Sequence, residues 1–176
     1  MNSNYISLKN IEELEKTLDE LSLKIIISDS IADDIFSLLT TIIDSNEFLL
    51  SDNSDKILFF IFSNWEFVSS EQKELLLPKL ENIYPTIAKW YSIYLISTIL
   101  GELYQNNQSF EALCRLKTIS DDERRALVAF GIGEIARYKK NTDLGEKALK
   151  IITEMKSDSS KKVKHEVELA FQRLKD

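Results

Sequence analysis

The chain has 176 residues, a single cysteine and a formal net charge of −7. Apolar residues make up 44% and charged residues 29% of it, which is typical of a folded protein and excludes a disordered one. Four glycines and two prolines are too few for the many tight turns of a β-sandwich or β-barrel. The composition therefore predicts a single all-α domain over residues 1–176.

Helix starts are marked along the chain by capping residues. Asn10, Ser30, Ser69 and Ser120 each stand three residues before a carboxylate or amide side chain. This spacing lets the two side chains satisfy the free amides of a first helical turn. Pro85 suits the first position of a further helix, where its missing N–H leaves no hydrogen bond unmade.

Between these starts, apolar residues recur three and four positions apart, as on one face of a helix. The short apolar run 24–27 is the only competing strand signal, and it has no partner strand. The chain is expected to form nine helices over residues 8–22, 30–44, 54–67, 70–83, 86–105, 108–118, 121–139, 143–156 and 159–175. If the first helix is a cap, the other eight form four pairs whose second helices begin 31 to 39 residues apart.

Three helical runs end on similar phrases, at residues 99–103, 131–135 and 169–174. The first two share a glycine followed by a glutamate, and Gly101 and Gly133 lie 32 residues apart. Self-similarity at this period predicts stacked helical hairpins, each of which covers the apolar face of its neighbour. An irregular helical bundle is the alternative.

Residues 158–170 place an Asp in a turn, then a Val followed by a basic residue, then a small residue beside leucine. This pattern resembles the second helix of a HEAT repeat, and residues 121–129 carry a looser version of it. The resemblance covers the last two predicted repeats. It implies a right-handed α-α superhelix, a HEAT-like stack of about four antiparallel helix pairs behind an N-terminal capping helix.

Residues suited to catalysis are scarce. Cys114 lies in an apolar run and His165, the only histidine, lies on a polar helix face, so we expect no nucleophile–base pair. One histidine and one cysteine cannot assemble the usual zinc sites. Acidic clusters such as 33–34 and 121–123 stand at helix starts, where carboxylates favour the positive end of the dipole. We therefore expect no enzyme activity, no cofactor and no metal.

Charge is distributed unevenly along the chain. Residues 1–88 contain 16 acidic residues, six lysines and no arginine, a net charge of −10, whereas residues 89–176 carry a net charge of +3. An acidic surface repels nucleic acid and attracts basic proteins. The basic residues of the second half are interleaved with acids, which predicts a solvated face rather than a phosphate-binding one.

The sequence also indicates where the protein resides. The longest apolar stretch, 90–100, is too short to span a bilayer, so no membrane partner is expected. Residues 1–5 lack the basic and apolar regions of a secretion signal. The expected location is cytoplasmic.

Aromatic residues gather between positions 59 and 94, and Tyr and Trp are favoured anchors at protein interfaces. Most of the aromatic residues in 59–67 are expected in the core. In a helical stack the second helices line the concave side, here 54–67 and 86–105. The expected partner contacts are Glu47, Asp52, Asp55, Glu66, Trp90, Tyr91 and Tyr94.

A small acidic helical-repeat protein of this kind resembles the HEAT-like immunity proteins of bacterial toxin systems, including contact-dependent growth inhibition. The resemblance implies a protein that is monomeric when free and binds one cognate toxin, a basic nuclease, so as to cover its active site. A scaffold or adaptor for protein–protein assembly is the alternative. A HEAT-like nucleic-acid-binding protein is disfavoured, because the first half is strongly acidic.

Overall fold

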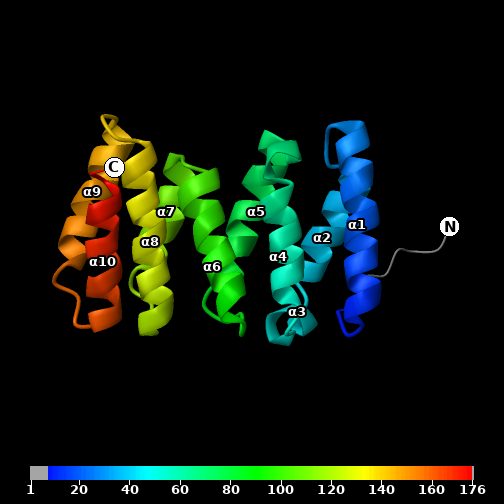
Figure 1. The fold of residues 1–176 in the computed structure, drawn as a ribbon, viewed down its shortest axis with the longest axis horizontal. Helices are drawn as coiled ribbons and strands as arrows, with labels where there is room; N and C mark the ends of the chain where they lie inside the picture. The colour runs from blue at the N-terminus through cyan, green and yellow to red at the C-terminus, as the bar shows by residue number, and fades with distance from the viewer. Residues whose placement is uncertain (1–7, 176) are drawn as a thin grey trace. The chain divides into compact units, whose positions relative to one another are not determined.

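The computed structural model describes residues 8–175, and every regular element in this range is helical (Figure 1). The predicted all-α fold is confirmed. The α-helices are α1 (Ile11–Ser28), α2 (Asp33–Ile43), α3 (Asn46–Leu50), α4 (Ser54–Ser63), α5 (Ser70–Ile83), α6 (Trp90–Thr98), α7 (Asn107–Leu116), α8 (Asp122–Tyr138), α9 (Asp143–Met155) and α10 (Lys161–Arg173). A 3-10 turn, η1 (Trp65–Phe67), follows α4, and a π turn, η2 (Ile99–Leu103), follows α6.

Two predicted caps are confirmed. The Asn10 side chain accepts the backbone N–H of Glu13 at 3.3 Å at the start of α1. At the start of α5, Ser69 and Gln72 form a reciprocal capping box, with both hydrogen bonds 3.1 Å long. These interactions satisfy amides that have no partner within the helix.

Two predicted capping residues and one predicted first helical residue are wrong. Ser30 caps nothing, because α2 begins three residues later and has no side-chain cap. The cap of α8 is Asp121 rather than Ser120. Pro85 does not begin α6, which starts at Trp90, because the amides that follow Pro85 hydrogen-bond back to the end of α5.

The structure also contains a helix that the sequence analysis did not predict. Helix α3 lies within the segment between the expected helices 30–44 and 54–67. Ser45 caps it by accepting the N–H of Phe48 at 3.1 Å, and the Phe48 side chain is completely buried. Helix α3 has only five residues, which is too short for helical periodicity to be visible in the sequence. A helix this short is stabilised by tertiary contacts, here by burial of the Phe48 ring.

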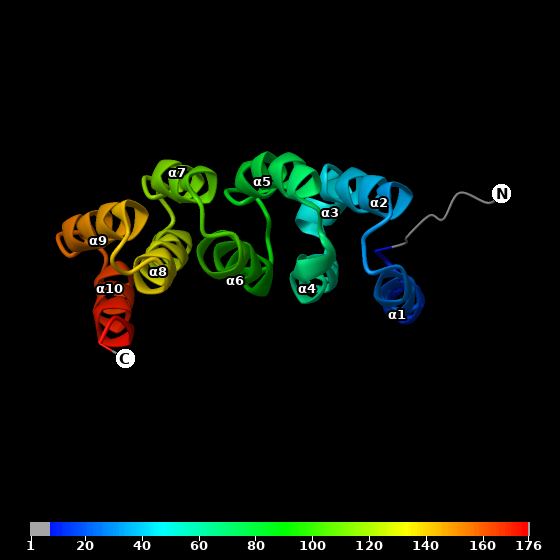
Figure 2. The same ribbon diagram turned by 90° about the horizontal axis from the view of Figure 1, so that it is seen from above.

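The chain divides into two compact units, one ending at Leu95 and the other beginning at Ile96. In the first unit, α1, α4 and the start of α6 form one layer and α2 and α5 form the other (Figure 2). The short helix α3 contacts both α2 and α4. In the second unit, α8 packs against α7, α9 and α10. A single domain over 1–176 and a right-handed superhelix stay predictions.

The repeated phrases of the sequence mark close helix packing in the second unit. A Cβ atom on Gly101 would lie 2.4 Å from the carbonyl oxygen of Gly131 in α8. A Cβ atom on Gly133 would lie 2.7 Å from the Cβ of Ala170 in α10. Glycine is therefore required where η2 and α10 approach the backbone of α8.

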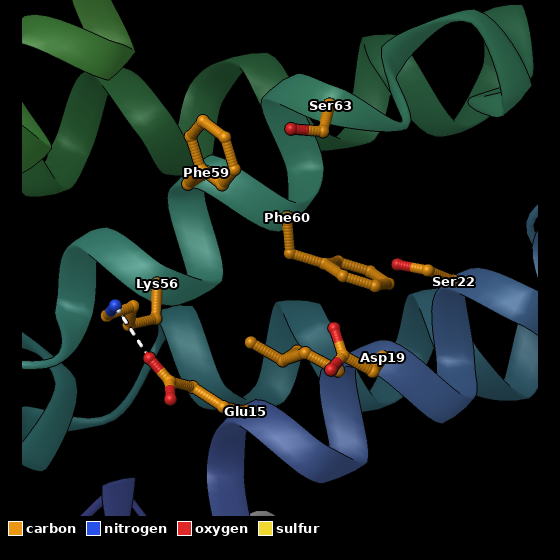
Figure 3. Close-up of a pocket in the computed structure, with 8 residues that line it drawn as sticks. Glu15, Asp19, Ser22, Lys56, Phe59, Phe60 and Ser63 are labelled. Atoms are coloured by element: carbon orange, nitrogen blue, oxygen red, sulfur yellow. Dashed lines mark hydrogen bonds and ion pairs between the residues drawn. The ribbon is translucent and has the colours of Figure 1, made fainter. Parts of the chain in front are cut away.

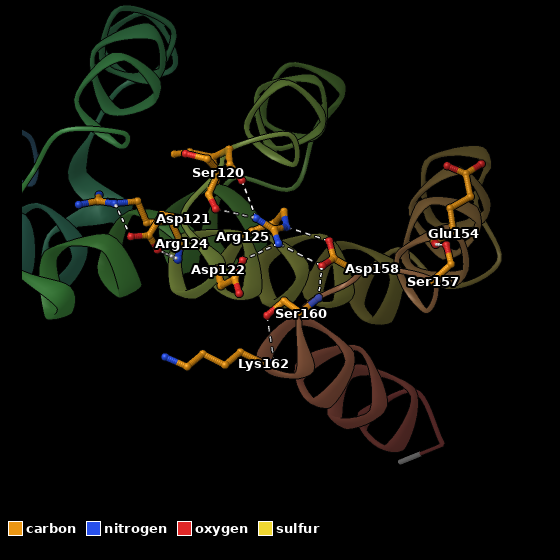
Figure 4. A network of polar contacts seen from close by, with 11 residues as sticks. Ser120, Asp121, Asp122, Arg124, Arg125, Glu154, Ser157, Asp158, Ser160 and Lys162 are labelled. Atoms are coloured by element: carbon orange, nitrogen blue, oxygen red, sulfur yellow. Dashed lines mark hydrogen bonds and ion pairs between the residues drawn. The ribbon is translucent and has the colours of Figure 1, made fainter.

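An arginine clasp connects the start of α8 to the turn before α10 (Figure 4). The Arg125 guanidinium donates to both carboxylate oxygens of Asp158, at 2.8 and 3.1 Å, and to the carbonyl of Ile119 at 2.7 Å. Asp158 also accepts the backbone N–H of Ser160 at 2.8 Å. The hydrogen bonds from Arg125 lower the pKa of Asp158, which is the turn aspartate of the HEAT-like pattern.

Candidate partner-binding surface

Three aromatic side chains form a stacked row on the first turns of α6. The rings of Trp90 and Tyr94 lie 5.9 Å apart with an 11° angle between their planes, and those of Tyr91 and Tyr94 lie 5.9 Å apart at 15°. Trp90 is 52% exposed, Tyr91 is 38% exposed and Tyr94 is half-buried. Their spacing of three and four residues places them on one side of the helix, so they present a continuous aromatic surface to solvent.

The start of α6 is fixed to the start of α4. The hydroxyl groups of Ser54 and Ser92 are hydrogen-bonded at 2.8 Å, and both residues are completely buried. The Lys89 ammonium pairs with the Asp55 carboxylate at 3.0 Å and donates to the backbone carbonyl of Asp52. The aromatic row is thus held in place before any partner arrives, which lowers the entropy lost on binding.

The predicted acidic contacts lie in different surroundings. Asp52 is exposed in the loop beside Lys89, and Glu47 is exposed in the first turn of α3. Asp55 is already neutralised by Lys89, and its side chain is only 13% exposed. Lys89 directly precedes Trp90, so Asp52 and Asp55 border the aromatic row.

Glu66 does not join this group. It lies in η1, beyond the opposite end of α4 from Asp55. At about 1.5 Å of rise per residue, the length of α4 alone separates the two carboxylates by roughly 12 Å. The candidate surface therefore consists of the α6 aromatic row and the acidic residues 52–55, which span the end of the loop before α4 and the first turn of α4 and are called the acidic loop below. Glu66 lies apart from this surface.

One aromatic residue of the segment 59–67, most of which was expected in the core, is exposed. Phe59 in α4 is 48% exposed, and its ring stacks on that of Phe62 with centroids 6.2 Å apart. The core-facing positions of α4 are instead filled by neighbours such as Ile57 and Ile61. Phe59 and Phe62 follow Asp55 by four and seven residues, so the three residues lie on one face of α4. This shared face with a charged residue was the sequence signal that could have indicated the exposure of Phe59.

Cys114 and His165, the two residues considered as a nucleophile–base pair, lie on different helices. Cys114 is half-buried in α7, and burial raises the pKa of its thiol, which disfavours the reactive thiolate. His165 is exposed on α10. Across residues 8–175, no group of three or more His, Cys, Asp or Glu side chains is arranged to hold a metal ion. No helix in this range has the length and apolar character needed to cross a membrane.

Arginines of the second unit are engaged by carboxylates. Glu134 is almost completely buried, and it pairs with Arg137 at 2.8 Å and with Arg173 at 2.9 Å. Burial raises the pKa of Glu134, although both arginines oppose this shift. Arg173 also pairs with Glu166 at 2.7 Å. These guanidinium groups therefore serve internal ion pairs.

No protein-family model matches this chain, and no curated protein or solved structure is significantly similar to it. The function of the aromatic and acidic surface is therefore inferred from its own chemistry and geometry.

Proposed function

We propose that this chain is a non-catalytic binding protein that neutralises a basic toxin, a nuclease, by covering its active site. The observation that carries the proposal is the exposed, pre-ordered aromatic row on α6 beside the acidic loop 52–55. The acidic loop lies in the half of the sequence, residues 1–88, that has a net charge of −10, and the aromatic row begins two residues after that half ends. A nuclease active site binds phosphates through basic groups, and carboxylates on an inhibitor occupy the same groups.

The two parts of the surface have different roles in this mechanism. The acidic loop and its surroundings attract the basic partner over a distance of about a Debye length and so raise the association rate. The aromatic row is then buried in the complex, where Trp and Tyr side chains supply much of the binding free energy and slow dissociation.

Two substitutions separate these roles. Trp90→Ala removes an anchor that is half exposed in the free protein, and it is expected to accelerate dissociation roughly 30-fold, a loss of about 2 kcal/mol. Asp52→Lys is expected to slow association and weaken its salt dependence. Asp55 is not substituted, because it holds Lys89. Matched controls are Tyr138→Ala, an equally exposed aromatic in α8, and Glu71→Lys, an exposed acid in α5.

The natural test partner is the protein encoded directly beside the gene for this chain. Its expression alone should arrest growth, and coexpression of this chain should restore growth. Trp90→Ala and Asp52→Lys should reduce that protection, whereas Tyr138→Ala and Glu71→Lys should not. Equal protection by all four variants would contradict the proposed surface. A scaffold function would be favoured instead if the neighbouring protein did not arrest growth, or if this chain bound two partners at once without any effect on growth.

A further inference from the structure

A separate pocket of about 300 Å³ lies between α1 and α4 in the first unit (Figure 3). Its apolar lining includes Leu18 from α1 and Phe60 from α4, both of which are otherwise buried, and the exposed Phe59 forms part of its rim. The volume suits one or two large apolar side chains rather than a complete cofactor.

One wall of this pocket carries an unneutralised negative charge. Glu15 accepts a hydrogen bond from Lys56 at 2.7 Å, and this bond raises the pKa of Lys56, which therefore remains a cation. Asp19 lies one turn further along α1 and lines the same pocket. Among residues 8–175, the side chain of Asp19 has no hydrogen-bond or ion-pair partner, so its carboxylate is available to a ligand.

The apolar surface continues beyond the pocket along α1. Asp19 and Ser22 of α1 line the pocket. Ile26 lies four residues after Ser22, a spacing that places it on the same face of α1. Ile26 is 61% exposed, and the neighbouring Ile27 is 84% exposed. A terminal helix of a helical stack normally has a polar outer face. Grouped exposed apolar side chains beside a pocket instead indicate a binding surface.

We propose that this groove binds a basic amphipathic segment of another protein. An apolar side chain of the segment fills the pocket against Leu18 and Phe60, a lysine or arginine pairs with Asp19, and a further apolar side chain covers Ile26. A second copy of this chain is a poor occupant, because α1 carries five acidic residues and two lysines and would repel itself. The groove binds such a segment whether or not the partner of the α6 surface is a toxin.

Fluorescence polarisation with two labelled model peptides tests this proposal. One peptide is an amphipathic helix of leucine and lysine, and the other has serine in place of every leucine. The first is expected to bind at least about tenfold more tightly, since only it buries apolar side chains. Ile26→Ser and Asp19→Asn should each weaken its binding by about tenfold. Leu75→Ser, an equally exposed apolar residue on α5, and Trp90→Ala should leave the affinity unchanged.

Three results would overturn the inference. Equal binding of both peptides would mean simple charge attraction. Unchanged affinity in Ile26→Ser, or a loss confined to Trp90→Ala, would place the peptide elsewhere. Self-association in sedimentation experiments that Ile27→Ser abolishes would identify a second copy as the occupant. Because these side chains are exposed, the variants should stay folded, and circular dichroism checks this directly.

Discussion

Replacing Gly101 with alanine is expected to lower the free energy of unfolding by about 3 kcal/mol. The new Cβ atom would lie 2.4 Å from the carbonyl oxygen and 2.5 Å from the Cα of Gly131. Both are backbone atoms, so no change of rotamer relieves the clash, and η2 must move away from α8. Urea unfolding followed by far-ultraviolet circular dichroism measures the loss.

Gly131→Ala is the matched control at the same contact. Its Cβ would approach the flexible side chain of Leu113 at 3.1 Å and the carbonyl of Ser97 at 3.1 Å. Leu113 can adjust, and alanine favours the helix by about 1 kcal/mol over glycine. The Gly131 variant should therefore lose much less stability. A Gly101→Ala protein as stable as the wild type would show that η2 and α8 do not approach this closely.

The second large effect is expected at the arginine clasp. Arg125→Ala removes the hydrogen bonds to Asp158 and Ile119 and leaves a largely buried carboxylate without its cation. Removing one partner from such a pair is expected to cost about 3 kcal/mol in unfolding experiments. Lys147→Ala is the control, because Lys147 pairs with Asp143 in an exposed ion pair, which contributes little to stability. Similar losses in both variants would argue against a specific clasp.

The same clasp predicts a pH dependence. Arg125 holds the pKa of Asp158 below its ordinary value of 3.8, so the folded state favours the ionised carboxylate. The resulting stability is present above about pH 4 and is lost as the pH falls through the lowered pKa. The stability difference between wild type and Asp158→Asn should therefore be largest near neutral pH and shrink in acid. Asp143→Asn, in an exposed pair, should show little difference at any pH. A difference that grows in acid would contradict the clasp.

Most of the helices could be predicted because their signals are local. Periodic apolar residues and caps such as Asn10 and Ser69 depend on neighbours three or four positions away. Helix α3 was missed because it is only five residues long, too short for apolar periodicity, and the burial of Phe48 is visible only in the structure. The glycine phrases predicted a repeat, but only the structure shows that Gly101 and Gly131 are in contact.

The candidate surface was predictable in part. The aromatic content of residues 90–94 indicated partner contacts on the predicted helix 86–105, but only the structure shows that the three rings stack in one row. The pairing of Asp55 with Lys89 joins residues 34 positions apart, and no local pattern reveals it. The exposure of Phe59 and Ile26 likewise depends on which helix faces the tertiary structure leaves uncovered.

The central proposal is that the aromatic row and the acidic loop of the first unit contact a basic partner. Hydrogen–deuterium exchange of the complete chain, alone and with the protein encoded beside its gene, tests this most directly. Protection is expected in the peptides that cover residues 47–62 and 89–95, and Trp90→Ala should reduce it. Protection confined to α8 and α10, with residues 47–62 and 89–95 exchanging as in the free protein, would contradict the proposal and identify the second unit as the binding surface.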